Sequence, residues 1–265
     1  MRVATFIRAA AALGALGAIG ATSARAQTYS EVAQGPGVKV EHPGSGARFV
    51  IRIENVSTPS TLKLSNGSTA PAPNAPGLWV VFTDGDPVFT PGKPDRGDGL
   101  ESLAEDGSPL KLAEAIGKVR GVVSSGTFTV PVGDREAGAA LPGKAFEFTI
   151  TAEPGQKLAI ASMFGQSNDL FFAPVNGGIP LFSGGKPIEG DITSKLALWD
   201  VGTEVNQEPG LGPDQAPRQA TPNTGKAERE PVQLVSWVKD GFRYPKTSDV
   251  IRVTVRAQSL AMGDK

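Results

Sequence analysis

Two acidic side chains lie on either side of a glycine in the stretch ALWDVGTEVNQEPG, residues 197–210. The spacing of Asp200, Gly202 and Glu204 would place both carboxylates on one face of a helix, but glycine, threonine and valines make this segment a poor helix. In a strand, the Cα atoms of Asp200 and Glu204 would be about 13 Å apart, at roughly 3.3 Å per residue. Gly202 instead permits a turn that brings the two carboxylates together.

A third carboxylate, Asp169, strengthens the case for a bound cation. Residues 161–174 (ASMFGQSNDLFFAP) predict a strand that ends near Phe164, a polar corner and a second strand. Like charges held close together need a cation, and Asp169, Asp200 and Glu204 on loops at one end of a sheet supply only oxygen ligands. Such a site suits Ca²⁺, which takes about 6–8 oxygens in irregular geometry, whereas Mg²⁺ requires a tight octahedron. The pair of acids alone leaves an alternative open, in which Asp200 caps a turn and Glu204 points to water.

Other motifs restrict the catalytic chemistry of the chain. The sequence has no cysteine, which excludes thiol catalysis, and its single histidine, His42, argues against a His/Cys zinc site and a Ser-His-Asp triad. The stretch GQSND at 165–169 lacks the second glycine of a nucleophile elbow. A carboxylate pair for glycoside hydrolysis stays open, because the sequence does not give the distance between carboxyl groups.

Alternating apolar and polar residues predict the elements that position these acids. In residues 49–56, 145–153 and 250–257, apolar side chains recur at every second position, which indicates half-buried strands of an antiparallel sheet. Further strands are predicted at 78–84, 126–132, 157–164, 170–175, 195–200 and 232–237. We therefore predict an all-β fold, an antiparallel β-sandwich of about nine strands, with the first and last of them in its core.

Two regions depart from the strand pattern. Residues 99–118 predict one or two short helices packed on one end or edge of the sandwich, and Ser102 with Glu105 fits a capping box at the start of a helix. Residues 203–231 have almost no large apolar side chains and predict a long polar surface loop. A loop of this length is usually either functional or disordered.

The first 26 residues have the pattern of a secretory signal peptide. Arg2 and Arg8 precede an apolar run at 9–21 that is too short to span a membrane, and Ala24–Ala26 forms an A-x-A cleavage signal. We expect cleavage after Ala26 and export to the periplasm or beyond. The mature chain, 27–265, is then a single domain with a core at about 49–257 and no transmembrane segment.

The charge of the chain argues against two kinds of partner. The net charge of the whole chain is −1, and loss of the three arginines of residues 1–26 leaves the mature chain near −4. No basic run remains after cleavage. Nucleic acid and anionic membrane surfaces are therefore not expected partners.

Two stretches resemble motifs of the spondin domain family. That family has a Ser-Pro-Asp corner after an apolar strand and, some thirty residues later, Trp-Asp-Ala-Gly-Thr-Asp. Here the matching stretches are SMFGQSND (162–169) and WDVGTE (199–204). Supporting similarities are FVIRIENVS (49–57), APGLWVVF (75–82) and GLESLAEDG (99–107), so that the resemblance extends from about Phe49 to Ala257.

The resemblance implies a β-sandwich similar to calcium-dependent phospholipid-binding domains, with one Ca²⁺ at a loop end. Carried over to this chain, the ligands are Asp169, Asp200 and Glu204. Asn168 stands where the family has proline, and Glu204 stands where it has the shorter aspartate. The cysteines of the animal members are absent, so calcium would matter more for stability.

The function implied by the resemblance is that of a binding module. Members in matrix proteins act in adhesion and ligand binding, so we expect an exported, non-enzymatic, calcium-binding domain that binds an unidentified extracellular or periplasmic protein or glycan. Two alternatives stay open. One is a glycan-active enzyme that uses a carboxylate pair, and the other is a structural envelope protein with a vestigial metal site.

Overall fold

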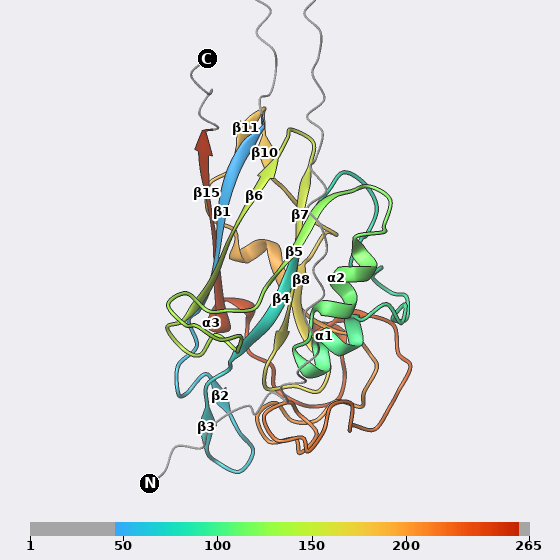
Figure 1. Ribbon diagram of the computed structural model, residues 1–265. Coiled ribbons are helices and arrows are strands. Elements are labelled where there is room, and N and C mark those ends of the chain that lie inside the picture. Colours follow the sequence, from blue (N-terminus) through green and yellow to red (C-terminus); the bar gives the residue numbers. More distant parts are fainter. Residues whose placement is uncertain (1–45, 260–265) are drawn as a thin grey trace, which may run out of the picture. The chain divides into compact units, whose positions relative to one another are not determined.

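The computed structural model describes residues 46–259 (Figure 1). The predicted signal peptide, residues 1–26, and His42 lie outside the described residues. The predicted all-β fold is confirmed: two large antiparallel sheets pack face to face, and only short helices accompany them. None of the helices within 46–259 is long and apolar enough to cross a membrane.

The smaller sheet has four strands, and all its pairs are antiparallel. In spatial order they are β12 (Gly190–Asp191), β15 (Ile251–Ser259), β1 (Ala47–Asn55) and β6 (Ala145–Ala152). The first and last long strands of the chain, β1 and β15, pair along their whole length, from Ala47 opposite Ser259 to Asn55 opposite Ile251. The prediction that both lie in the core is confirmed.

The larger sheet has seven strands and carries both of the motifs that contain the acids. Its order is β14 (Gln233–Leu234), β13 (Leu196–Asp200), β8 (Leu170–Pro174), β7 (Lys157–Phe164), β4 (Asn74–Phe82) and β5 (Val122–Phe128), with β9 (Ile179–Pro180) paired to β7. Two further hairpins form separate two-stranded sheets. They are β2 (Leu62–Lys63) with β3 (Thr69–Ala70) and β10 (Phe182–Ser183) with β11 (Lys186–Pro187).

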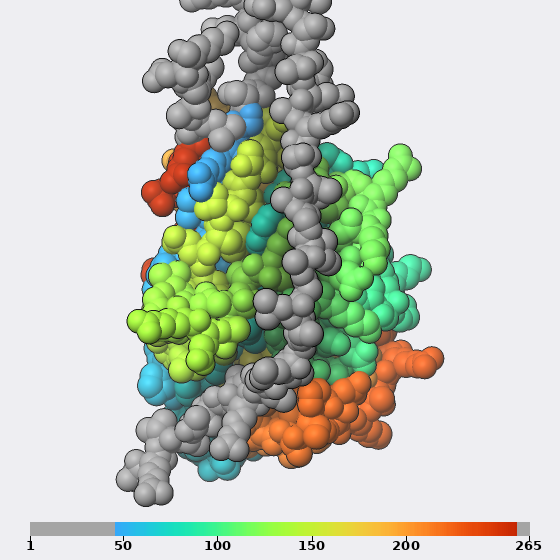
Figure 2. All heavy atoms as spheres, viewed as in Figure 1, coloured from blue at the N-terminus to red at the C-terminus, as the bar shows by residue number. Residues whose placement is uncertain are grey.

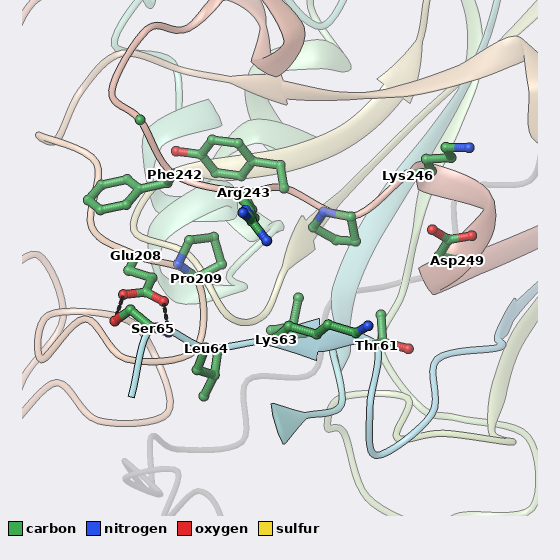
Figure 3. A pocket seen from close by; sticks show the side chains of 14 residues that line it. Thr61, Lys63, Leu64, Ser65, Glu208, Pro209, Phe242, Arg243, Lys246 and Asp249 are labelled. Carbon is green, nitrogen blue, oxygen red and sulfur yellow. Dashed lines mark hydrogen bonds between the residues drawn. The ribbon is translucent and has the colours of Figure 1, made fainter. Parts of the chain in front are cut away.

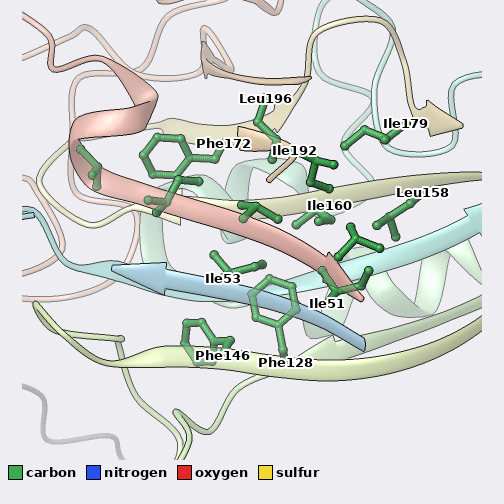
Figure 4. Packing of buried hydrophobic residues seen from close by; sticks show 14 of the residues in the cluster. Ile51, Ile53, Phe128, Phe146, Leu158, Ile160, Phe172, Ile179, Ile192 and Leu196 are labelled. Carbon is green, nitrogen blue, oxygen red and sulfur yellow. The ribbon is translucent and has the colours of Figure 1, made fainter. Parts of the chain in front are cut away.

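The main core fills the space between the two sheets (Figure 4). The alternating residues of β1 supply one side of it, because Phe49, Ile51 and Ile53 are at most 1 % exposed. Leu158 and Ile160 of β7 face them from the larger sheet. Burial of such side chains is the main favourable term in folding, at about 25 cal/mol per Å² of apolar surface.

The helices cover the outer face of the larger sheet. The two predicted helices are α1 (Leu100–Asp106) and α2 (Leu110–Ile116), and they form a second core with apolar residues of β4, β7 and β8. The predicted position of these helices at an end or edge of the sandwich is wrong. Leu100, Leu103 and Leu112 are fully buried there because the outer face of this sheet is itself apolar.

Two predicted strands are mostly wrong. Of residues 126–132, only 126–128 belong to a strand, because β5 ends at Phe128. In residues 232–237 only β14 is extended, and the 3₁₀ helix η2 (Val235–Trp237) follows it. Val235, the first residue of η2, is buried, whereas Ser236 and Trp237 are both exposed, so buried and exposed residues do not alternate after β14. The remaining short elements are the 3₁₀ helix η1 (Thr193–Lys195) and the helix α3 (Thr247–Val250).

The long polar segment 203–231 forms a surface at one end of the sandwich (orange in Figures 1 and 2). It has its own hydrogen bonds: Gln207 Nε2 donates to Asp214 at 2.6 Å, and Arg218 Nε donates to the Gly212 carbonyl at 2.7 Å. Gln219 also donates to Asp106 at the end of α1 at 2.9 Å. The segment therefore has a defined path across the end of the larger sheet.

Candidate metal centre

Strand pairing places Asp169 and Asp200 side by side at the end of the larger sheet. Asp169 is the last residue of the corner between β7 and β8, and Asp200 is the last residue of β13. In the pairing of β8 with β13, Asp200 lies opposite Leu170, and the Val201 N–H donates to the Asp169 carbonyl at 3.2 Å. Two acids 31 residues apart in sequence thus become neighbours.

Asp169 is fully buried, and half of its carboxylate has no partner. Its Oδ2 accepts hydrogen bonds from the backbone N–H groups of Thr203 at 2.8 Å and Glu204 at 3.1 Å. Its Oδ1 has no hydrogen-bond partner among the described residues, although the side chain is 0 % exposed. A buried polar atom without a partner costs about 1–3 kcal/mol, and more when the group is charged.

Asp200 is held by the turn that follows it. Its Oδ1 accepts from the Gly202 N–H at 2.7 Å, and its Oδ2 accepts from Nδ2 of Asn206 at 2.7 Å. Gly202 has a φ of +75°, a left-handed conformation that favours glycine. The predicted turn at Gly202 is confirmed, and the side chain of Asp200 is 2 % exposed beneath it.

Replacing Gly202 with alanine is expected to lower the free energy of unfolding by about 2–4 kcal/mol. The positive φ alone costs roughly 1–2 kcal/mol for an L-residue. The new Cβ would also lie 2.6 Å from the Glu230 carbonyl oxygen, which is backbone and cannot move freely. Urea denaturation measures the change.

The control is Gly67→Ala, because Gly67 has a similar φ of +83° but open space around the position of a Cβ. It should lose only the conformational part, about 1–2 kcal/mol. Equal losses in the two variants would show that the close packing of Gly202 against Glu230 is unimportant.

Glu204 is also buried, but its carboxylate is hydrogen-bonded to groups other than those that bind Asp169 and Asp200. Its Oε2 accepts from Nδ2 of Asn168 at 3.2 Å, and its Oε1 accepts from the Gly225 N–H at 2.8 Å. Burial raises the pKa of Glu204 while these two hydrogen bonds lower it, and the charges of Asp214 and Asp106 raise it further. The carboxylate therefore faces the 203–231 segment.

Glu105 is an additional buried acid that sequence reasoning did not place here. Its Oε1 accepts from the hydroxyl of Thr203 at 2.8 Å, and its Oε2 has no partner among the described residues. The same Thr203 hydroxyl lies 3.3 Å from Oδ2 of Asp169. One hydroxyl proton cannot serve both carboxylates at once, which leaves one of them short of a donor.

The predicted capping box is wrong, and this explains why Glu105 was missed. Helix α1 begins at Leu100 after Gly99, and no side chain caps it. Glu105 consequently lies in the last turn of α1, beside the buried Leu103 and Ala104, and is 2 % exposed. A helix start at Leu100 would have placed Glu105 next to this buried face.

The buried acids have raised pKa values. Burial raises the pKa of Glu105 to about 8, and burial followed by the charge of Asp200 raises that of Asp169. Burial also raises the pKa of Asp200, against the lowering effect of its hydrogen bonds from Asn206 and Gly202. None of the four ion pairs within the described part of the chain includes Asp169, Asp200, Glu204 or Glu105.

The three predicted ligands are thus brought to the same end of the sandwich but not to one point. Within residues 46–259, no three Asp, Glu, His or Cys side chains lie in an arrangement that could hold one metal ion. Asp169 and Asp200 are neighbours, whereas Glu204 is bonded to Asn168 and Gly225. The site of three carboxylates stays a prediction, and Glu204 is the member whose position least fits it.

No protein-family model matches the chain, and a search of curated proteins finds no match. The chemistry of the site therefore rests on the geometry of its own residues.

Proposed function

We propose that this chain is an exported, calcium-binding β-sandwich of spondin type that acts as a non-enzymatic binding or adhesion module. The observation that carries the proposal is the fully buried carboxylate of Asp169, which has an unpartnered oxygen and lies beside Asp200. The resemblance of residues 162–169 and 199–204 to the spondin motifs supports the same assignment.

A cation is the natural partner of such a group. Removing a carboxylate from water costs several kcal/mol unless an opposite charge or a proton compensates it. Asp169 and Asp200 have no basic partner among the described residues, so each must either bind a proton or lie beside a bound cation. Without a cation, burial favours the protonated form of these acids, and this makes the protein less stable at neutral pH than at acidic pH.

The donor set favours Ca²⁺ among cations. The Asp169 carboxylate contacts the Thr203 hydroxyl and the backbone N–H groups of Thr203 and Glu204, and it lies beside the Asp200 carboxylate. No His or Cys is among these groups. Hard oxygen ligands of unequal direction suit Ca²⁺ better than Mg²⁺ or Zn²⁺. The unpartnered oxygens of Asp169 and Glu105 are free to take part.

Glu204 does not group with Asp169 and Asp200 in its present position within residues 46–259, so it can join the ion only by moving its side chain. The resemblance implies that it is a ligand, while its carboxylate accepts hydrogen bonds from Asn168 and Gly225. We therefore assign Asp169 and Asp200 as the principal ligands. Glu105, which has an unpartnered oxygen, is assigned as an additional ligand. Glu204 is proposed as a ligand that must change its side-chain conformation.

Calcium binding should be directly measurable. In calorimetric titration, the protein is expected to bind Ca²⁺ with one site and with much lower affinity for Mg²⁺. At about 100 times the dissociation constant, binding adds about 2.7 kcal/mol to the stability. For a domain of this size that raises the melting temperature by about 5–10 °C. Excess chelator should remove this gain and increase proteolysis within 203–231.

The matched control is Glu136→Gln, which removes an exposed carboxylate far from the site in sequence. It should bind calcium as the wild type does. No heat of binding and no effect of chelator on melting would contradict the proposal and would favour the alternative of a structural protein with a vestigial site.

The glycan-active alternative has one observation in its favour. An open cavity, described below, contains the carboxylates of Glu208 and Asp249. However, both oxygens of Glu208 accept hydrogen bonds from Ser65, one from its backbone N–H and one from its hydroxyl, and Figure 3 shows Asp249 at the other end of the cavity. Release of reducing sugar that stops in Glu208→Gln would favour this alternative.

A further inference from the structure

A cavity of about 730 Å³ opens next to the 203–231 segment (Figure 3). One wall is the β2 strand with the residues on either side of it, 61–65, and the other is the segment 241–246. Glu208 and Pro209 close one end, and Asp249 lies at the other. The volume is in the range of sites that bind small organic ligands, about 300–1,000 Å³.

Three basic side chains line this cavity without acidic partners. Lys63 comes from β2, and Arg243 and Lys246 come from the opposite wall. None of them forms an ion pair within residues 46–259. Figure 3 shows the Arg243 guanidinium pointing into the space between Phe242, Pro209 and Lys63. The acidic members of the lining are fewer, and Glu208 is already bonded to Ser65.

The same walls have apolar surfaces and rings. Phe242 is 36 % exposed, Tyr244 is half-buried, and Leu64 lies on the facing wall. The hydroxyl of Tyr244 donates to Asp240, which fixes this ring at the base of the segment. A ligand bound in this cavity would therefore contact both cationic groups and flat apolar surfaces.

We propose that this cavity binds an acidic saccharide, with a carboxylate or sulfate on Arg243 and Lys63 and a sugar ring against Phe242. Arginine binds oxyanions of this kind through two parallel hydrogen bonds, which are stronger than hydrogen bonds between neutral groups. Saccharide rings have apolar C–H faces that pack on aromatic rings by dispersion. The proposal names a ligand class for the binding role proposed above, and it rests on that role. The residues that it uses are separate from those of the metal centre.

The backbone around the cavity is less suited to a peptide. A peptide that binds as an added strand needs unpaired backbone groups along an edge. Here β2 has only two residues, one of its edges pairs with β3, and the adjoining Ser65 N–H donates to Glu208, so little free strand edge is left for a peptide. Side chains rather than backbone groups are thus offered to the occupant.

Binding can be measured by calorimetry with defined probes. Trigalacturonate tests the carboxylate, a sulfated disaccharide tests the sulfate, and maltotriose is the neutral counterpart. We expect one or both acidic probes to bind and maltotriose not to bind. Arg243→Ala should weaken the binding at least about tenfold, the effect of losing hydrogen bonds to a charged group. Arg243→Lys should recover part of it.

Arg120→Ala is the matched control, because Arg120 is exposed, lies at the end of the α2 region and makes no ion pair within the described residues. It should leave binding unchanged. The proposal is overturned if neither acidic probe binds, if maltotriose binds equally well, if Arg120→Ala has the same effect as Arg243→Ala, or if a pentaglutamate peptide binds in preference. Each titration is run with calcium and with chelator, so that failure of the metal centre and failure of this cavity are read separately.

Discussion

Replacing Asp169 with asparagine should weaken calcium binding at least about 100-fold and stabilise the calcium-free protein. Loss of a group that only supports a ligand typically costs 10–100-fold in metal affinity, and loss of a ligand itself should cost no less. The amide keeps an oxygen that can accept from the N–H groups of Thr203 and Glu204. It removes the buried charge that lies beside Asp200, which should add about 1–3 kcal/mol to the free energy of unfolding in chelator.

Weaker calcium binding together with higher stability of the calcium-free protein would identify Asp169 as part of a binding site. A residue that only stabilises the fold would not give both effects. Calorimetry gives the affinity, and urea denaturation in chelator at neutral pH gives the stability. Glu136→Gln should change neither quantity, since Glu136 is exposed. If Asp169→Asn destabilised the calcium-free protein, the carboxylate would be serving the fold and the assignment of Asp169 as a ligand would lose its main support.

Calcium-free protein should become less stable as the pH rises from about 5 to 8. The pKa of Glu105 is raised to about 8 in the folded protein, and that of Asp169 is also raised. Between the unfolded pKa, near 4, and the raised folded pKa, the folded state binds more protons than the unfolded state. Stability is therefore highest at the acidic side of this window and falls with pH. Each unit of raised pKa corresponds to about 1.4 kcal/mol, so the total loss should reach several kcal/mol.

Saturating calcium should remove most of this pH dependence, because the ion takes the place of the protons. Melting temperatures at several pH values, with calcium and with chelator, measure both curves. Glu105→Gln should flatten the curve in chelator, whereas Glu136→Gln, which removes an exposed carboxylate far from the site in sequence, should leave it unchanged. A chelator curve that rises between pH 5 and 8 would mean that these acids are ionised and satisfied in the folded state.

Local patterns predicted most of the larger elements, and the reason is burial on one face. The strands β1, β6 and β15 alternate because one side of each faces the main core. Gly202 was also predicted correctly, since few residues other than glycine adopt a φ of +75°. The 232–237 strand was wrong because the chain turns into η2 after the two residues of β14, and Ser236 and Trp237 are both exposed there.

The details of the candidate site depend on contacts between distant residues. Glu105 reaches Thr203 across 98 positions, and nothing in the sequence around α1 indicates this partner. The direction of Glu204 depends on Gly225, where even a Cβ would lie 1.8 Å from the Glu204 carboxylate. The spacing of Asp200 and Glu204 predicts a turn. It does not predict the close contact between Glu204 and Gly225, and so it does not predict the direction of the second carboxylate.

The 203–231 segment, which buries these acids, should also limit the rate at which a bound ion exchanges with solvent. Asp169, Asp200, Glu204 and Glu105 are at most 2 % exposed, and residues of the 203–231 segment donate hydrogen bonds to Asp169, Asp200 and Glu204. An ion held there can exchange with solvent only during local opening of this segment, which has its own free-energy cost. Release in chelator should therefore be slow compared with that from an open surface site. Its rate should rise in variants that weaken the cover, such as Gly225→Ala, which forces the Glu204 carboxylate from its place.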